Sequence, residues 1–290
     1  MVRIVDSLAE ISADYDAVFC DLWGCVHDGI AALPEAVEAL TAYRATGGVV
    51  VLLTNAPRPR AAVAEQIARI GVPDAAWDTI ATSGDATRLA MFTGAVGRRV
   101  YFIGEPRDEI FFEPLGVVAD PVEIERVPLD RAEGIVCTGP FDTSADPDEL
   151  RPVLLEAKTR GLPLLSANPD IVVDRGDRRE WCGGAVARLY ERMGGTSLSF
   201  GKPHAPVYDL ARRRLAEVAR EVDGERILAI GDGAETDIRG AMGEGIDSLF
   251  VSGGLARLDT KTEAQPDQEA LDAFVARGMI APTFAIGYLR

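Results

Sequence analysis

Short apolar runs that alternate with longer amphipathic stretches are the feature that most restricts the fold of this chain. Residues 17–20, 49–53, 226–230 and 246–251 have the length and apolar character of buried strands. The stretches near them have the spacing of helices, and they cover residues 34–43, 57–70 and 236–243. Strands that alternate with helices predict a parallel sheet covered on both faces. The expected fold class is therefore α/β, with a three-layer, doubly wound parallel-sheet core.

The middle of the chain repeats this pattern as a separate block. Its candidate strands and helices lie at residues 99–103, 134–137, 147–160, 162–166 and 183–193. Because the pattern of the first strands returns only after this block, we expect an inserted α/β domain at residues 83–190. The outer domain would then comprise residues 1–82 and 191–290. A chain of 290 residues is long enough for two such domains.

The charge balance restricts the partners of the chain. With 46 acidic and 30 basic residues its formal net charge is −16. Binding to nucleic acid or to an anionic membrane requires clustered Lys and Arg, so both partners are disfavoured. The longest strongly apolar run, residues 49–53, is also too short to cross a bilayer. A small anionic substrate stays compatible, because a nest of donors with a metal ion reverses the field locally.

The N-terminal residues and the cysteines favour a cytoplasmic protein. Residues 1–16 are interrupted by acidic side chains and have no apolar core of a signal peptide. The four cysteines form no CxxC pair, which fits reduced thiols in a cytosol. Cys25 lies close to the residues discussed next, where a reactive thiol and a small packing residue are alternative interpretations.

Polar residues follow the first two strand candidates, where doubly wound folds bind their ligands. Asp21 follows the first strand, and glycines at positions 24 and 29 indicate a turn after it rather than a helix. An Asp in this place is also a common helix cap or turn residue. Thr54 and Asn55 follow the second strand, where a hydroxyl and an amide can donate to an anion or form a turn.

Two later segments combine a base with acids in similar places. Lys202 lies between a glycine and a proline after the apolar residues 198–200, which restricts a side chain that is otherwise a solvated charge. Asp232 and Asp237 follow another strand candidate, and two carboxylates there can hold a hard cation through oxygen. Each segment alone is a weak signal, and their order along the chain carries more information.

In this order the four segments resemble the motifs of the haloacid dehalogenase superfamily, which run nucleophilic Asp, Ser or Thr, Lys and an acidic pair. The long insert between the second and third motifs makes the chain similar to class IIA, which contains p-nitrophenyl phosphatases, nucleotide monophosphatases and phosphoglycolate phosphatases. Segments that fit this class are residues 167–170 (Ala-Asn-Pro-Asp), 201–203 (Gly-Lys-Pro), 231–232 and 236–237. The resemblance spans nearly the whole chain. It implies a type-2 α/β cap at residues 83–190, a Mg²⁺ cofactor and a small phosphorylated metabolite as substrate.

The resemblance also implies roles for individual residues. Asp21 would attack phosphorus and form an aspartyl-phosphate, which divides one hard step into two. The implied Mg²⁺ ligands are the second oxygen of Asp21, the backbone carbonyl of Trp23, Asp232 and, through water, Asp237. The residues implied at the transferring phosphoryl group are Thr54, Asn55 and Lys202. Such a site works mostly by positioning and charge neutralisation.

Trp23 departs from the superfamily pattern. Most phosphatases of this superfamily carry a second Asp there, which protonates the leaving group and then activates water. A backbone carbonyl at position 23 still serves the metal, but losing the proton donor costs roughly 10²–10⁴-fold in rate. Either His27, Asp28 or a cap residue supplies the proton, or the aspartyl-phosphate hydrolyses slowly, as in a phosphotransferase or a poor phosphatase. A further alternative is a sensor that binds phosphorylated ligands without turnover. The retained nucleophile, lysine and acidic pair favour slow or specialised hydrolysis.

Substrate selection is expected from the cap and from the loop after the nucleophile. The candidate substrate-binding residues are His27, Asn168, Asp170 and Gly183. Each has a simpler interpretation, because Asn-Pro-Asp is an ordinary turn and a loop His often forms local hydrogen bonds. A basic cluster in the cap either meets a second anionic group or lies in solvent, and it comprises Arg175, Arg178 and Arg179. Caps of this type often mediate homodimers, and nothing in the residues names the substrate.

A dinucleotide-binding enzyme is the rival class. Gly231 and Gly233 after a strand are similar to the start of a dinucleotide-binding turn, but Thr236 replaces the third glycine. Such a fingerprint also belongs near the first strand of its domain, so this class is disfavoured.

Overall fold

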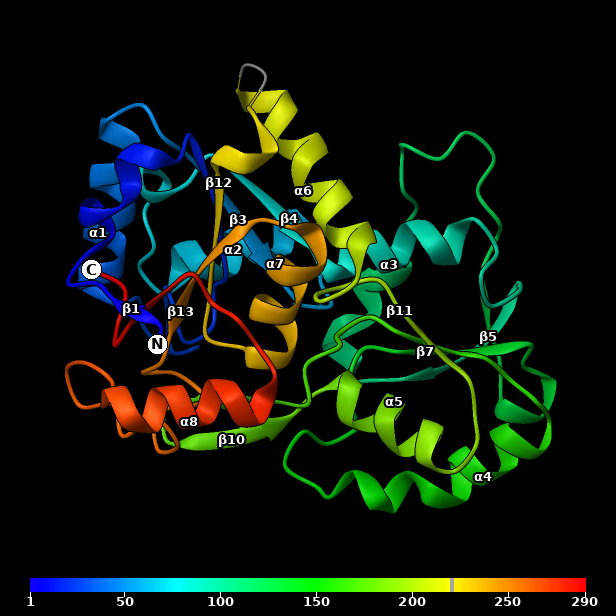
Figure 1. Cartoon of the computed structure of the whole chain (residues 1–290). Coiled ribbons are helices and arrows are strands. Elements are labelled where there is room, and N and C mark those ends of the chain that lie inside the picture. The colour runs from blue at the N-terminus through cyan, green and yellow to red at the C-terminus, as the bar shows by residue number, and fades with distance from the viewer. Residues whose placement is uncertain (220–221) are drawn as a thin grey trace.

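The computed structural model describes residues 1–219 and 222–290, which form two domains side by side (Figure 1). The larger domain, here called the core, has a seven-stranded sheet in the order β1-β14-β13-β12-β2-β3-β4. Its strands are β1 (Arg3–Ile4), β2 (Ala17–Cys20), β3 (Val49–Thr54), β4 (Thr79–Thr82), β12 (Ile227–Gly231), β13 (Asp247–Val251) and β14 (Phe284–Ile286). All neighbouring pairs are parallel, which confirms the predicted parallel sheet.

Helices cover both faces of this sheet. They are α1 (Pro34–Ala45), α2 (Arg60–Arg69), α6 (Ala205–Val218), α7 (Arg239–Glu244) and α8 (Gln268–Gly278). Successive residues of β3 point to opposite faces: Val50 and Leu52 pack in the cluster that contains α1 and α2, whereas Val51 and Leu53 pack in the cluster that contains α6 and α7. A strand that is buried on both faces must be apolar along its length. This is why β2, β3, β12 and β13 were recognisable as apolar runs, and the three-layer core is confirmed.

The smaller domain, the cap, has its own five-stranded parallel sheet in the order β11-β8-β7-β5-β6. Its strands are β5 (Arg99–Ile103), β6 (Glu125–Arg126), β7 (Gly134–Cys137), β8 (Leu164–Ser166) and β11 (Ser197–Ser199). Helices α4 (Arg151–Thr159) and α5 (Gly183–Arg192) pack on one face, whereas α3 (Ser83–Phe92) contributes Met91 and Phe92 to the other. The expected second α/β layer is therefore present.

A two-stranded antiparallel hairpin extends from the cap toward the core. Its strands are β9 (Val172–Arg175) and β10 (Arg178–Trp181). The N–H of Gly176, in the turn between these strands, donates to the carbonyl of Asp28 in the core at 3.0 Å. No strand was predicted here, because the hairpin is charged and only partly buried.

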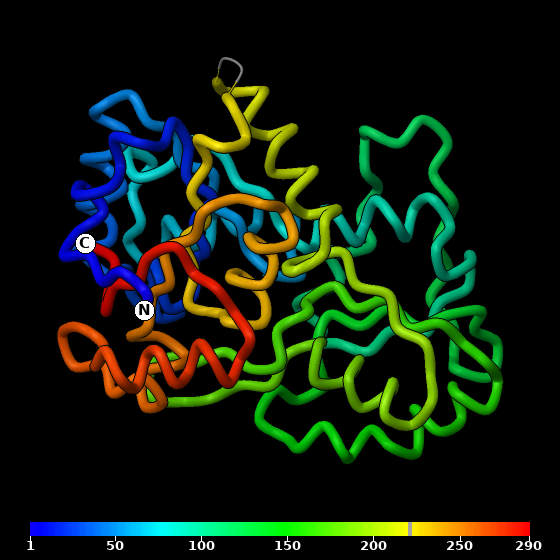
Figure 2. Tube along the Cα trace, in the orientation of Figure 1, coloured from blue at the N-terminus to red at the C-terminus, as the bar shows by residue number. Residues whose placement is uncertain are grey.

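The path of the chain corrects the predicted return to the core. Residues 191–290 were assigned to the core, and the apolar residues 198–200 were expected to be one of its strands. The structure instead pairs β11 with β8 in the cap sheet, and the chain re-enters the core only at α6 (Figure 2). A three-residue apolar run carries no information about which sheet it joins, so periodicity alone could not place it.

Short turns of 3₁₀ helix connect these elements, and one π-helical turn precedes α7. They cover Leu8–Glu10, Ser12–Asp14, Asp74–Ala76, Pro106–Phe112, Leu129–Arg131, Pro147–Leu150 and Gly224–Arg226, with the π turn at Ala234–Ile238. Both chain ends lie on the core, where β1 pairs with β14 (Figure 2). Within the described residues, no helix has the length and apolar character needed to cross a membrane.

Candidate active site

Three neighbouring strands of the core end with residues that the sequence singled out. β12, β2 and β3 are adjacent and parallel, so their carboxyl ends lie at one edge of the sheet. Asp21 follows β2, and its N–H donates to the carbonyl of Ile230 in β12 at 2.8 Å. Thr54 is the last residue of β3, and Asp232 follows β12. The sheet thus brings these three side chains together from distant parts of the sequence.

The ammonium of Lys202 lies between two carboxylates. Its Nζ is 2.7 Å from Asp21 Oδ1 and 2.6 Å from Asp237 Oδ1. Lys202 is only 2% exposed, so these contacts are made with little screening by water. Asp237 is fixed in turn by the N–H of Gly233, which donates to its Oδ2 at 3.0 Å. Because both oxygens of Asp237 have protein partners, its first role is to hold Lys202; the water-mediated metal contact stays a prediction.

Asn55 holds the backbone of Lys202 in place. The N–H of Lys202 donates to Asn55 Oδ1 at 2.8 Å, and Asn55 Nδ2 donates to the Lys202 carbonyl at 3.2 Å. The same Nδ2 donates to Oδ1 of Asp170 in the cap at 2.8 Å. Lys202 therefore reaches the site without being at the end of a core strand. Asn55, expected at the phosphoryl group, uses its amide to join the lysine loop to the cap.

Thr54 is buried beside Asn55. It is 1% exposed, and its Oγ1 accepts the N–H of Ala56 at 3.2 Å. This bond leaves the hydroxyl proton of Thr54 free to be donated, so the predicted contact with a phosphoryl oxygen is compatible with the local geometry and stays a prediction.

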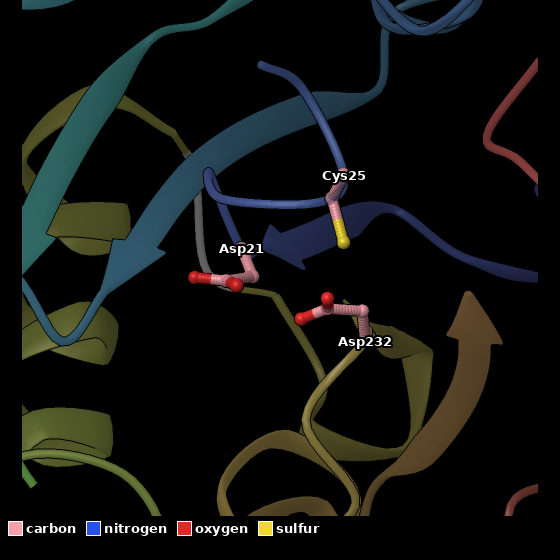
Figure 3. A group of neighbouring side chains, drawn as sticks. All are labelled: Asp21, Cys25 and Asp232. Atoms are coloured by element: carbon pink, nitrogen blue, oxygen red, sulfur yellow. The ribbon is translucent and has the colours of Figure 1, made fainter. Parts of the chain in front are cut away.

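Asp21, Cys25 and Asp232 form a compact cluster of ligand atoms. One carboxylate oxygen from each Asp and the sulfur of Cys25 all lie within 4.8 Å of one another. Figure 3 shows the three side chains converging from the loop after β2 and the loop after β12. Two of the three predicted direct metal ligands, Asp21 and Asp232, are thus side by side.

The surroundings of Asp232 fit a cation held by oxygen. Its Oδ2 accepts the N–H of Leu255 at 3.0 Å, and two glycines leave room for the carboxylate. A Cβ on Gly24 or Gly254 would lie 2.2 Å or 2.0 Å from Asp232 Oδ2. The carbonyl of Trp23, the third predicted ligand, accepts no hydrogen bond within residues 1–219 and 222–290. A hard divalent ion takes its ligands from such carboxylate and carbonyl oxygens.

The carboxylates of the site outnumber its ammonium. Burial, with the charges of Asp237 and Asp170, raises the pKa of Asp21 to about 7 against the opposing effect of Lys202. Burial and the charges of Asp21 and Asp237 hold the pKa of Asp232 well above its ordinary value. The three carboxylates that face Lys202 raise the pKa of its ammonium against the effect of burial. A divalent cation would relieve this excess of negative charge before an anionic substrate binds.

His27 and Asp28 make hydrogen bonds within their own loop, and Nε2 of His27 is left without a partner in the described part of the chain. Nδ1 of His27 accepts the N–H of Gly29 at 3.0 Å, and burial lowers the pKa of this His to about 4. At neutral pH the imidazole is therefore neutral and keeps its proton on Nε2. Asp28 Oδ1 accepts the N–H groups of Ile30 and Ala31, both at 2.8 Å, and these bonds lower its pKa. The simpler interpretation of both residues, as local hydrogen-bonders, fits these contacts best.

Trp23 is packed between the loop and the cap. Its ring meets that of His27 edge-on with centroids 5.0 Å apart, and the Arg175 guanidinium lies 5.0 Å from its ring centroid. Gly29, with φ of +83°, lies against the indole, and a Cβ there would be 2.3 Å from the ring. A left-handed backbone without a side chain is what this contact requires. Position 23, where the resemblance led us to expect a proton donor, presents an aromatic surface here.

The cap hairpin docks on this same loop. Besides stacking on Trp23, Arg175 donates through Nη1 to the carbonyl of Gly29 at 3.2 Å. The N–H of Gly176 donates to the carbonyl of Asp28 at 3.0 Å. Arg175 of the predicted basic cluster therefore contacts the core. Arg179 forms an exposed ion pair with Asp174, as a solvated charge would.

The three predicted substrate-binding residues of the cap, Asn168, Asp170 and Gly183, make different contacts. Asn168 Oδ1 accepts the N–H of Asp170 at 3.0 Å and closes the Asn-Pro-Asp turn. Gly183 begins α5 against this turn, with room of only 3.0 Å between an added Cβ and the Asn168 carbonyl. Asp170 alone of the three bonds to the core, through Asn55. Asn168 and Gly183 thus shape the turn that presents Asp170.

Two cavities meet at Trp23 and Asp170. The larger, of about 320 Å³, is also lined by Asp21, His27 and Asp232. The smaller, of about 90 Å³, lies between core and cap and is also lined by Arg58, Asn168, Arg175 and Trp181. A leaving group displaced at Asp21 would therefore be bounded by Trp23 and Asp170.

Arg58 is a residue of this cleft that sequence reasoning missed. It lies 3.6 Å from Asp108 of the cap, whose other oxygen accepts the hydroxyl of Thr138 at 2.9 Å. Its position four residues after Thr54 placed it near the site, but its cap partner could not be found from sequence spacing.

Comparison with known proteins identifies the family. A model of haloacid dehalogenase-like hydrolases matches residues 18–118, and a second, HAD-hydrolase-like, matches residues 199–276. A solved haloacid dehalogenase-like hydrolase from Brucella suis is 38% identical, with a TM-score of 0.86 over 99% of this chain and 100% of that one. The chain belongs to the haloacid dehalogenase-like hydrolases. The two matches contain Asp21, Thr54, Lys202, Asp232 and Asp237.

Further relatives place it in class IIA, a group of phosphoric monoester hydrolases. Human glycerol-3-phosphate phosphatase is 26% identical over 277 residues, which are 88% of this chain and 84% of the relative. A glycerol phosphate phosphatase from Mycobacterium tuberculosis, solved in complex with magnesium, is 24% identical with a TM-score of 0.62, over 84% of this chain and 70% of that one. This class IIA chain is thus a phosphoric monoester hydrolase, and glycerol phosphate and magnesium are what these relatives are named with.

The raised carboxyl pKa values predict how magnesium affects stability. In the metal-free enzyme the folded-state pKa of Asp21, about 7, lies above its value in the unfolded chain. The protonated form therefore stabilises the fold below the unfolded pKa, and this contribution is lost as the pH rises through about 7. Mg²⁺ needs ionised ligands. We expect Mg²⁺ to raise the Tm more at about pH 8 than at about pH 5.5.

Scanning calorimetry of the enzyme with Mg²⁺ or with EDTA at both pH values measures this difference. Asp232→Asn, which removes one charged ligand, should suppress the Mg²⁺-dependent shift. A shift in the native enzyme that is equal at both pH values would contradict the assignment.

Proposed function

We propose that this enzyme is a Mg²⁺-dependent phosphatase that forms an aspartyl-phosphate on Asp21, with slow or specialised hydrolysis. The observation that best supports it is the buried contact of Lys202 with Asp21 and Asp237, next to the Asp21–Asp232 pair. A buried ammonium orients a nucleophilic carboxylate and offsets the charge of an incoming phosphate. Relatives named for glycerol phosphate support a small polyol phosphate as substrate.

The chemistry divides into two balanced steps. A carboxylate oxygen of Asp21 bonds to phosphorus while the bond from phosphorus to the leaving oxygen breaks, and that oxygen takes up a proton. Water then attacks the same phosphorus, which releases inorganic phosphate and regenerates Asp21. Mg²⁺, held by Asp21, Asp232 and the carbonyl of Trp23, would neutralise charge on the phosphoryl oxygens. Thr54 and Lys202 would hold those oxygens through hydrogen bonds.

Asp170 is the cap residue that we assign as proton donor. Trp23 carries no acidic group, and the bonds of His27 and Asp28 tie them to their own loop. Asp170 lines both cavities beside Trp23, and burial raises the pKa of its carboxyl, so that its protonated form persists to higher pH. A carboxyl in such a place can protonate a leaving oxygen, as general acids do.

Substitutions of Asp21 and of Trp23 should change the hydrolysis rate in opposite directions. Asp21→Asn should abolish Mg²⁺-dependent release of p-nitrophenol from p-nitrophenyl phosphate. Trp23→Asp should exceed the native enzyme by up to about 10²-fold, because it restores a carboxylate that can activate water in the second step, whatever the leaving group. Trp23→Asn is the matched control, since it loses the same indole contacts without gaining an acid. Equal rates of Trp23→Asp and Trp23→Asn would show that position 23 takes no part in proton transfer. Turnover retained in Asp21→Asn would show that Asp21 is not the nucleophile.

Asp170→Asn tests the proton donor. The Asn carbonyl can still accept from Asn55, so the hydrogen bond between core and cap is kept. Single-turnover release of an alkyl leaving group from glycerol phosphate should fall by roughly 10²-fold or more. Release of p-nitrophenol, a good leaving group that needs little protonation, should fall far less. An equal fall for both substrates would assign Asp170 a structural role only.

A non-catalytic sensor of phosphorylated ligands is the alternative. Phosphate release from a panel of sugar, polyol and nucleoside phosphates, with Mg²⁺ or EDTA, separates the two functions. Trapping of a phosphorylated Asp21 by acid quench and mass spectrometry then shows which half-reaction is slow. Absence of both phosphate release and trapped phosphoenzyme on every substrate would favour the sensor.

A further inference from the structure

Cys25 is a buried thiol directed at the metal site. Its sulfur lies within 4.8 Å of carboxylate oxygens of Asp21 and Asp232, and Figure 3 shows it on the side chain that points toward Asp232. Cys25 is 0% exposed. A thiol is not a ligand that Mg²⁺ prefers, since this ion takes oxygen ligands.

The thiol of Cys25 has no hydrogen-bond partner in the part of the chain that the structure describes. Two other buried cysteines do have one: Cys20 donates to the carbonyl of Asp21 at 3.2 Å, and Cys137 to that of Gly139 at 3.6 Å. Cys25 therefore combines full burial, an unpartnered polar atom and two neighbouring carboxylates. This combination distinguishes it from Cys20 and Cys137.

Packing explains the burial of Cys25 but not its chemistry. It lies in the apolar cluster under the loop, together with Cys20 and Leu22, where a Val would also bury a small side chain. The N–H of Val26 donates to the carbonyl of Leu22 at 2.8 Å and closes the turn. Gly24, with φ of +71°, gives this turn its left-handed step. The backbone thus directs side chain 25 back to the strand ends whatever the residue, and only a Cys places sulfur there.

Sulfur and two carboxylates together form a donor set for a softer ion than magnesium. Zn²⁺ and Co²⁺ accept thiolate together with carboxylate, with bond lengths of about 2.3 Å to sulfur and about 2.1 Å to oxygen. Such ligand atoms lie roughly 3.5 Å apart around a tetrahedral ion. The ligand atoms of this cluster lie within 4.8 Å of one another, so side-chain rotation would bring them closer around such an ion.

We propose that Cys25 is a third protein ligand for a thiophilic divalent cation such as Zn²⁺ or Co²⁺, held together with Asp21 and Asp232. Mg²⁺ would use the two carboxylates without the sulfur. Coordination replaces the S–H bond by an S–metal bond and releases one proton to solvent. A thiophilic ion held in this way would engage the nucleophile Asp21 and compete with Mg²⁺. The inference shares the metal site of the proposed function and adds to it a discrimination between ions.

Titration of the full-length, metal-free enzyme with Co²⁺ tests this directly. We expect a sulfur-to-cobalt charge-transfer band in the near ultraviolet with the native enzyme and with Cys137→Val, and no such band with Cys25→Val. By calorimetry, Cys25→Val should lower the ratio of Zn²⁺ to Mg²⁺ affinity by more than about tenfold, the loss expected even for an outer contact of a metal ligand. Cys25→Ser, which keeps a small polar side chain but removes sulfur, should also lose the band.

A native spectrum without the band, or a band that persists in folded Cys25→Val or Cys25→Ser, would overturn the inference. Far-ultraviolet circular dichroism identifies which variants are folded, and two substitutions of different polarity keep the test decisive if one does not fold. The proposed function fails separately. A cobalt–sulfur band without any Mg²⁺-dependent phosphate release would leave this inference standing and reject the phosphatase.

Discussion

The ammonium of Lys202 between Asp21 and Asp237 is the interaction on which the rest of the site depends. All three groups are buried, and removing one partner from such an arrangement typically costs about 3–5 kcal/mol, because an uncompensated charge stays behind. Forming such a buried contact adds little net stability, because each charge must first leave water. Clusters of buried charges are instead typical of functional sites, where the charges act on a substrate.

Core and cap contribute together to the position of Lys202. Its side chain pairs with core carboxylates, whereas its backbone is held by Asn55, which also bonds to Asp170 of the cap. Any displacement of the cap thus acts on the loop that carries the lysine. On the other side of the cleft, the hairpin fixes the loop of Trp23 through Arg175. These contacts lie on either side of the cavities. A movement of the cap would therefore also move the Lys202 ammonium that pairs with Asp21.

The central core strands β2, β3, β12 and β13 and the polar residues that follow them could be predicted from the sequence, because buried parallel strands are apolar throughout and end abruptly. Asp21, Thr54 and Asp232 were found in this way. The sheet that residues 197–199 join could not be found, since the run is short and equally apolar in either domain. The hairpin was missed because it is stabilised by contacts with the core, such as Arg175 on Trp23, rather than by its own alternation. Tertiary contacts, not local pattern, decided these segments.

Trp23 shows how one substitution changes both chemistry and shape. An Asp at this position would face the cleft as an acid, whereas the indole offers a surface on which Arg175 stacks and under which Gly29 must lack a side chain. A cation–π contact of this sort is worth roughly 0.5–2 kcal/mol. The loop therefore exchanges proton transfer at position 23 for a firmer contact with the cap. Under the proposed function the proton then has to come from the cap side, where Asp170 lines the same cavities as Trp23.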